Sequence, residues 1–244
     1  MMTKEEKLNK ATARAVGVLF LLATATYIIG NGLLESILTM PDYLSQVYPN
    51  RVQVVAGALL VFVDTVVVVG IGVLLFPILK RFNESIAIGY VATRIVEFVF
   101  LVFGAIGPLM LITLSQDYVA AGAPDASHFQ TAGSLFVTQH FLGYQIGMMA
   151  LGLGSLFFCY LLYTSKLIPQ WMSLLGLIGY AALFIGAVLE LFGLSVGLML
   201  SIPGGIFELI LPLWLIVKGF NVAALTAAAP RQKQAYPGLS VPTA

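Results

Sequence analysis

Six stretches of the sequence are apolar and long enough to cross a lipid bilayer, and they limit the possible folds more than any other feature. They cover residues 12–34, 52–76, 85–114, 138–163, 172–194 and 196–217. A helix rises about 1.5 Å per residue, so about 20 residues cross the hydrocarbon core. The stretches lack the alternation of barrel strands, and backbone groups in lipid must be paired internally. The sequence therefore predicts an all-α fold, a polytopic membrane protein built as a six-transmembrane-helix bundle.

The composition supports an integral membrane protein and argues against other classes. Only 9% of the 244 residues are charged and 59% are hydrophobic, whereas soluble domains are about 25% charged. The net charge is +1 and no basic stripe is present, so no nucleic-acid partner is expected. Cys159 is the single cysteine, which excludes an intrachain disulfide.

The basic residues lie almost entirely on one side of the predicted spans. That side holds ten of the twelve: Lys4, Lys7, Lys10, Arg14, Lys80, Arg81, Lys166, Lys218, Arg231 and Lys233. The opposite side has Arg51 alone, and Arg94 lies within a span. Basic residues collect in cytoplasmic loops. Both termini are therefore expected to be cytoplasmic, in a multi-pass protein whose first partner is the lipid bilayer.

The chain is expected to form one domain and a tail. Residues 1–220 form the six-helix transmembrane domain, and 221–244, rich in Ala, Pro, Thr and Gln, are expected to be a disordered cytoplasmic tail. The second span is expected to stop at Pro77. Residues 193–197 are so short a link that the last two spans should form a tight antiparallel hairpin. Residues 125–127 can cap a helix that continues into the fourth span.

Five ionisable residues interrupt the apolar stretches: Asp64, Arg94, Glu97, Glu190 and Glu208. Each costs about 2.5–3.5 kcal/mol to place in the bilayer, even on lenient scales. If all five were charged, they would sum to a net charge of minus three. The interior must therefore hold protons, bind a cation or open to water.

Four of these residues are predicted to form a ligand- or ion-binding site near the middle of the membrane. Asp64, Arg94, Glu97 and Glu208 lie at overlapping depths, about 13–20 Å from the predicted cytoplasmic ends of their helices. Arg94 and Glu97 are three residues apart and share a helix face. A structural cluster that only fixes helix packing is the alternative, and the sequence leaves both open.

The sixth span carries two prolines around its acid. Pro212 has no N–H, so the carbonyl of Glu208 loses its helical donor, and Pro203-Gly204-Gly205 loosens the preceding turn. Broken helices at the membrane midplane are typical of transporter binding sites. A simple packing kink is the alternative.

A second polar cluster is expected toward the outer surface. Glu35, His140 and Glu190 fall near the outer ends of their spans. One histidine and two carboxylates can form a three-ligand zinc site, although no fixed metal-binding spacing is present. A solvated interfacial cluster is the alternative, so a metal is left open and no other cofactor is expected. Gly143, Gly147 and Gly154 on the fourth span favour close helix packing, within the bundle or in a homo-oligomer.

Several motifs resemble a bacterial integral-membrane family catalogued as domain of unknown function 4386. They are residues 12–22 (TARAVGVLFLL), the acid at Asp64, 94–97 (RIVE), 161–169 (LLYTSKLIP), 175–180 (LGLIGY), 206–209 (IFEL) and 213–219 (LWLIVKG). The resemblance implies six or so helices and a bacterial cytoplasmic (inner) membrane, and it implies no known activity.

The sequence favours binding or transport of a small solute, lipid or ion at the midplane site. Asp64 and Glu208 would exchange protons or cations, Arg94 would be the fixed counter-charge and Glu97 its partner. A proton-linked version predicts that at least one of the acids is neutral near pH 7. Two alternatives remain: a metal-dependent enzyme acting on a lipid-like substrate at the outer cluster, and a regulatory or scaffold membrane subunit.

Overall fold

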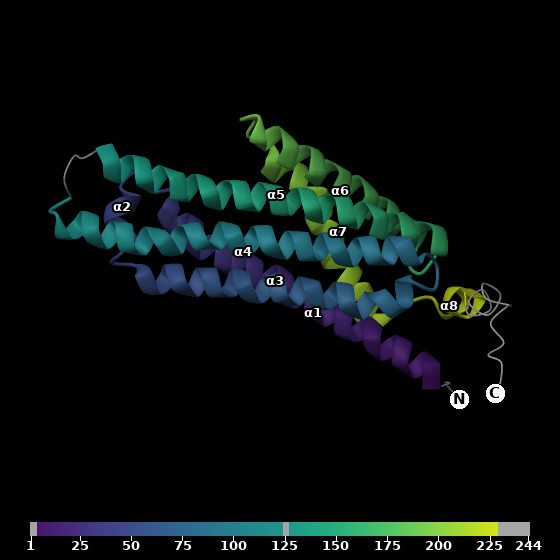
Figure 1. The fold of residues 1–244 in the computed structure, drawn as a ribbon. Coiled ribbons are helices and arrows are strands. Elements are labelled where there is room, and N and C mark those ends of the chain that lie inside the picture. Colours follow the sequence, from purple (N-terminus) through teal and green to yellow (C-terminus); the bar gives the residue numbers. More distant parts are fainter. Residues whose placement is uncertain (1–3, 124–126, 229–244) are drawn as a thin grey trace, which may run out of the picture.

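The computed structural model describes residues 4–123 and 127–228. Within them the chain forms only helices: α1 (Lys4–Leu38), α2 (Tyr43–Gln46), α3 (Arg51–Leu79), α4 (Glu84–Ala120), α5 (Ser127–Ser165), α6 (Gln170–Leu191), α7 (Gly197–Val217) and α8 (Val222–Ala228) (Figure 1). Six of these, α1 and α3 to α7, are long and apolar enough to cross a membrane. The predicted all-α, six-helix membrane fold is confirmed.

The six spanning helices form a ring. Each packs against the next in chain order, from α1 to α3, α4, α5, α6 and α7, and α7 packs back against α1. Such an arrangement gives every helix a lipid-facing side and an inner face. Charged side chains can avoid lipid on the inner face. The ring therefore creates the shared interior that the buried charges need.

Close contact between α4 and α5 depends on glycine. A Cβ on Gly143 would lie 2.6 Å from the Cα of Gly104 and 2.7 Å from the carbonyl oxygen of Phe100. Gly147 packs on Leu101 of α4, and Gly154 of the same α5 face lies against Thr93 of α4. Small residues let membrane helices approach closely. The predicted glycine face of α5 therefore serves packing within the bundle.

The helices extend further than the apolar stretches predict. α4 and α5 are 37 and 39 residues long, and Figure 1 shows them continuing past the α6–α7 hairpin at the end where they are joined. α5 begins at Ser127 and runs unbroken through its span, as expected; the proposed cap at Asp125 lies outside the described residues. At this end α2 packs on α4, where the Ser115 hydroxyl donates to the Leu44 carbonyl (2.5 Å) and accepts from the N–H of Tyr48 (2.8 Å).

Two predicted boundaries are wrong. α3 does not stop at Pro77 but ends at Leu79, because a proline in the last turn removes only one hydrogen bond. The segment after Phe220 was expected to be disordered, yet residues 222–228 form α8. The Asn221 side chain accepts from the N–H of Ala223 (3.1 Å), and the Asn221 N–H donates to the Leu167 carbonyl (2.9 Å). These bonds fix the start of α8 against the α5–α6 link, while residues 229–244 lie outside the described part.

The predicted tight hairpin between the last two spans is present. α6 ends at Leu191 and α7 begins at Gly197, with Gly193 in a left-handed conformation (φ 81°) that favours glycine. The carboxylate of Glu190 accepts a hydrogen bond from the N–H of Gly197 (2.7 Å). A carboxylate at a helix N-terminus is favourable because that end is partly positive. This contact holds the hairpin together.

The links that carry the basic residues lie at one end of the bundle. Figure 1 places the start of α1 at the same end of the bundle as the α3–α4 and α5–α6 links and α8. The clustering agrees with the alternation expected of six spans, while the assignment of this end to the cytoplasm stays a prediction.

Candidate functional site

A cavity of about 520 Å³ lies inside the ring, and all six spanning helices line it. Most of its lining is apolar, but it holds four charged residues: Asp64 from α3, Arg94 and Glu97 from α4, and Glu208 from α7. The structure therefore brings all four residues of the predicted midplane site to one place. Their role in binding a ligand stays a prediction.

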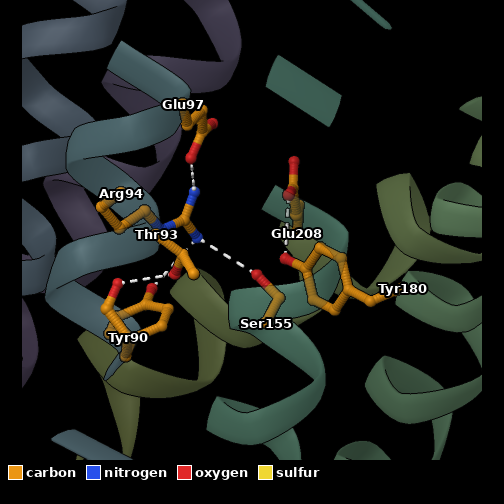
Figure 2. A network of polar contacts seen from close by, with 7 residues as sticks. All are labelled: Tyr90, Thr93, Arg94, Glu97, Ser155, Tyr180 and Glu208. Carbon is orange, nitrogen blue, oxygen red and sulfur yellow. Dashed lines mark hydrogen bonds and ion pairs between the residues drawn. The ribbon is translucent and has the colours of Figure 1, made fainter. Parts of the chain in front are cut away.

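Arg94 is held by its neighbours on three sides. Its Nη1 donates to the Glu97 carboxylate (2.8 Å), and its Nη2 donates to the Tyr90 hydroxyl (3.0 Å) and more weakly to Ser155 (3.4 Å) (Figure 2). Arg94 and Glu97 are only 3% and 2% exposed. The Tyr90 ring in turn stacks on Phe158, with ring centroids 4.7 Å apart. The expected pairing of Arg94 with Glu97 is confirmed, and the network ties α4 to α5.

Glu208 lies across from this network and has a different partner. Its carboxylate accepts a hydrogen bond from the hydroxyl of Tyr180 on α6 (2.8 Å) (Figure 2). In the part of the chain that the structure describes, no basic side chain lies within ion-pair distance of Glu208. A neutral hydroxyl supplies one donor and no charge. The negative charge of an ionised Glu208 would thus have no direct counter-charge.

Asp64 is the least satisfied of the four. Its side chain lines the cavity and is 5% exposed. It has neither a hydrogen bond nor an ion pair with any residue between 4 and 123 or 127 and 228. A buried carboxylate without a partner is costly. Of the four residues, Asp64 therefore most needs a proton, a cation or water, because the described chain supplies no hydrogen-bond donor or counter-charge to its carboxyl group.

The cavity has more acids than bases. Three carboxylates line it against one guanidinium, and Glu97 already neutralises Arg94. Full ionisation would leave Asp64 and Glu208 as two uncompensated negative charges. This corrects the expected surplus of three, because Glu190 lies at the α6–α7 hairpin and not in the cavity. Protons, a bound cation or water must compensate the remaining two.

The predicted outer metal cluster does not form. His140 lies 3.4 Å from Glu35, and its other ring nitrogen faces the carbonyl of Gly104 (3.1 Å). Glu190 instead binds the start of α7. Nowhere in residues 4–123 and 127–228 do three His, Cys, Asp or Glu side chains converge to hold a metal. The three-ligand zinc hypothesis is therefore wrong, because the hairpin uses its third ligand.

The expected break in the last span is also absent. α7 remains one helix from Gly197 to Val217, with Pro203 and Pro212 inside it. Neighbouring helices in a membrane can accommodate the backbone groups that a proline leaves free. Gly204 packs against Gly179 of α6 at this level. The helix therefore carries Glu208 on a continuous backbone.

Three tyrosines line the cavity in addition to the predicted site residues. Tyr27, Tyr144 and Tyr180 line it, and Tyr27 of α1 stacks on Tyr144 of α5 with ring centroids 6.1 Å apart. Tyrosine in membrane proteins is enriched at the interfaces, where its hydroxyl reaches water. These tyrosines could have been predicted from the sequence, because each lies in the middle of an apolar span and its hydroxyl needs a polar neighbour away from lipid.

Comparison with known proteins identifies the family of this chain. Searches of curated proteins and of solved structures both found no match. The family model with the description "Domain of unknown function (DUF4386)" matches residues 15–219, which include α3 to α7, most of α1 and all four charged residues of the cavity. The chain therefore belongs to the DUF4386 family.

Proposed function

We propose that this protein binds a small cationic solute or ion in the central cavity, in exchange for protons carried by Asp64 and Glu208. The observation that supports the proposal is a cavity within the ring in which two of the three acids, Asp64 and Glu208, have no basic partner in the described chain. A cation or a proton compensates such acids, whereas an anion would add to the imbalance. Binding of this kind also suits transport, with the cytoplasmic membrane of a prokaryote as the expected location.

The other charged residues have supporting roles in this proposal. Arg94 donates to Glu97, Tyr90 and Ser155 through its two terminal nitrogens, so it positions the pair as a fixed neutral unit, while its buried Nε has no partner among the described residues. Tyr180 orients Glu208 toward the cavity through one hydrogen bond. Asp64 has no such bond, so a bound cation would be its direct counter-charge, and the proton that Asp64 releases would pass to water.

Infrared difference spectroscopy tests the proposal directly. The protein in lipid nanodiscs should show a neutral carboxylic C=O band near pH 7 that weakens on addition of tetramethylammonium. Asp64→Asn or Glu208→Gln should remove part of that band. If neither variant changes the band, the cavity holds no exchangeable proton and the proposal is wrong.

Two acids outside the cavity provide matched controls. Asp42 accepts a hydrogen bond from the Gln46 side chain (2.8 Å), which lowers the pKa of that carboxyl, so it is ionised near pH 7. Glu190 lies at the α6–α7 hairpin. Asp42→Asn and Glu190→Gln should therefore leave the cation-sensitive band unchanged.

A structural role is the second candidate, and the Arg94 network favours it. The network links α4 and α5 through buried side chains alone. A regulatory or scaffold subunit would need this link for folding and would show no cation-dependent carboxyl signal. The same infrared measurement therefore separates the two candidates.

A further inference from the structure

The distance between α1 and α7, which form one wall of the cavity, differs between the two ends of the cavity. At the end near the N-terminus the two helices touch: a Cβ on Gly17 would lie 2.7 Å from the Pro212 carbonyl and 2.8 Å from the Ile216 side chain. Arg14 also donates to the Ile216 carbonyl (3.3 Å). The ring is therefore closed along this part of the α1–α7 contact.

Toward the other end α1 and α7 separate. Gly32 and Gly205 both line the cavity and are exposed, and a Cβ on either would meet no atom within 4 Å. Ile28, which also lines the cavity, is 64% exposed. Gly30, which lies between Ile28 and Gly32 in the sequence, packs on α3. A Cβ added to Gly30 would lie 2.8 Å from the Leu60 side chain and 2.9 Å from the Gly57 carbonyl oxygen. Here α1 leans on α3 and leaves an opening to α7.

This opening faces lipid. Large apolar side chains are exposed on both helices beside it: Ile29 of α1, and Met199, Ile202 and Ile206 of α7. Gly205 is thirteen residues before Lys218, hence about 20 Å from that end of the helix. The opening therefore lies within the hydrocarbon region, in the half of the bilayer away from the basic end.

The chemistry of the cavity fits an amphipathic ligand. Its apolar side chains suit a hydrocarbon body, and Asp64 and Glu208 suit a positive head group. A bare divalent metal ion fits poorly, because no three carboxylate or imidazole groups of the described chain converge. A volume of about 520 Å³ is within the range of sites for small organic molecules.

We infer that the cavity takes an amphipathic ammonium compound directly from the bilayer, through the opening between α1 and α7. This inference rests on the proposed function, since the head group is held by the same two acids. It adds the class of ligand and its route. A compound that partitions into lipid is concentrated next to the opening and needs no path through water.

Binding of two ammonium probes to the protein in nanodiscs tests the class of ligand. Radiolabelled decyltrimethylammonium should bind at least about tenfold more tightly than tetramethylammonium. Empty nanodiscs and nanodiscs with the Asp64→Asn/Glu208→Gln double variant, which lacks both acids, correct for partition into lipid. If neither probe binds above these controls, the proposed function and the inference both fail. Equal affinity for the two probes would retain the proposed function and overturn the inference.

Bulky side chains at the opening test the route. Gly32→Trp and Gly205→Trp add volume in open space and should slow association of decyltrimethylammonium at least about tenfold. Gly70→Trp and Gly89→Trp are matched controls, because their added side chains also enter open space but neither residue lines the cavity. These controls should stay within about twofold of the parent protein.

Association rates in the Gly32 and Gly205 variants equal to those of the controls would exclude this route. Gel filtration establishes that each variant is folded and monodisperse. Gly32→Leu and Gly205→Leu, with smaller additions at the same positions, provide the measurement if a tryptophan variant misfolds, and a milder slowing is then expected.

Discussion

The buried ion pair of Arg94 and Glu97 makes each side chain depend on the other. Both are almost fully buried, and their charged atoms lie 2.8 Å apart. Removing one partner of a buried pair leaves an unmatched charge and costs about 3–5 kcal/mol, whereas removing both is far less costly. The stability of the bundle should therefore depend on whether Arg94 and Glu97 are both present or both absent, more than on either charge alone.

A double-mutant cycle measures this dependence. Arg94→Met should lower the free energy of unfolding by about 3–5 kcal/mol, and Arg94→Met/Glu97→Gln should recover more than half of that loss. Unfolding in mixed detergent micelles is the measurement. Glu84→Gln, at an exposed acid in the first turn of the same helix, should change stability by no more than about 1 kcal/mol. Equal losses in the single and the double variant would contradict a coupled pair.

The contact between α4 and α5 depends on the absence of side chains. Gly143→Ala would place a Cβ 2.6 Å from the Cα of Gly104, and a backbone atom cannot move aside as a flexible side chain can. We expect a loss of about 1–3 kcal/mol in unfolding free energy, despite the better helix propensity of alanine. Thermal unfolding in detergent gives the comparison.

Gly89 on α4 is the control for this substitution, because its Cβ would meet open space. Gly89→Ala should leave stability unchanged or raise it by up to about 1 kcal/mol. A Gly143→Ala protein as stable as Gly89→Ala would show that the two helices are less tightly packed than the structure has them.

The positions of the spanning helices could be predicted from the sequence, because only long apolar helices are stable in lipid. The ends of several of these helices were predicted wrongly. Helices continue into water, where polar residues fit equally well, so α1 begins at Lys4 and α4 extends to Ala120. The start of α8 depends on Asn221 bonding to Leu167, a contact between segments far apart in the sequence. Periodicity and hydropathy carry no information on such contacts.

The candidate site was predictable only in part, for a related reason. Charged side chains in a span must avoid lipid, so the meeting of Asp64, Arg94, Glu97 and Glu208 followed from physical necessity. Their partners depend on the rotation of each helix about its axis, which no single sequence states. The same limit explains the error at Glu190, whose carboxylate turns to the N–H of Gly197 and away from the expected metal site.

At the scale of the whole molecule, orientation decides which half of the bilayer supplies the ligand. The opening between α1 and α7 lies in the first half of α7, away from Lys218. Figure 1 shows the end of α7 on the same side of the bundle as the α3–α4 and α5–α6 links, whose sequences contain Lys80, Arg81 and Lys166. Basic ends face the cytoplasm in most membrane proteins. The opening should therefore face the outer leaflet, and an amphipathic cation would enter from there.

Cysteine labelling in intact cells tests this orientation. The native Cys159 is fully buried, so a new cysteine at an exposed link gives the only accessible thiol in the described chain. Asp42→Cys should react with a membrane-impermeant maleimide added outside, because Asp42 lies in the link that should be outside. Glu84→Cys, in the first turn of α4 at the basic end, should react only after the membrane is permeabilised. If instead Glu84→Cys reacts in intact cells and Asp42→Cys reacts only after permeabilisation, the opening faces the inner leaflet. The ligand would then have to enter from the cytoplasmic side.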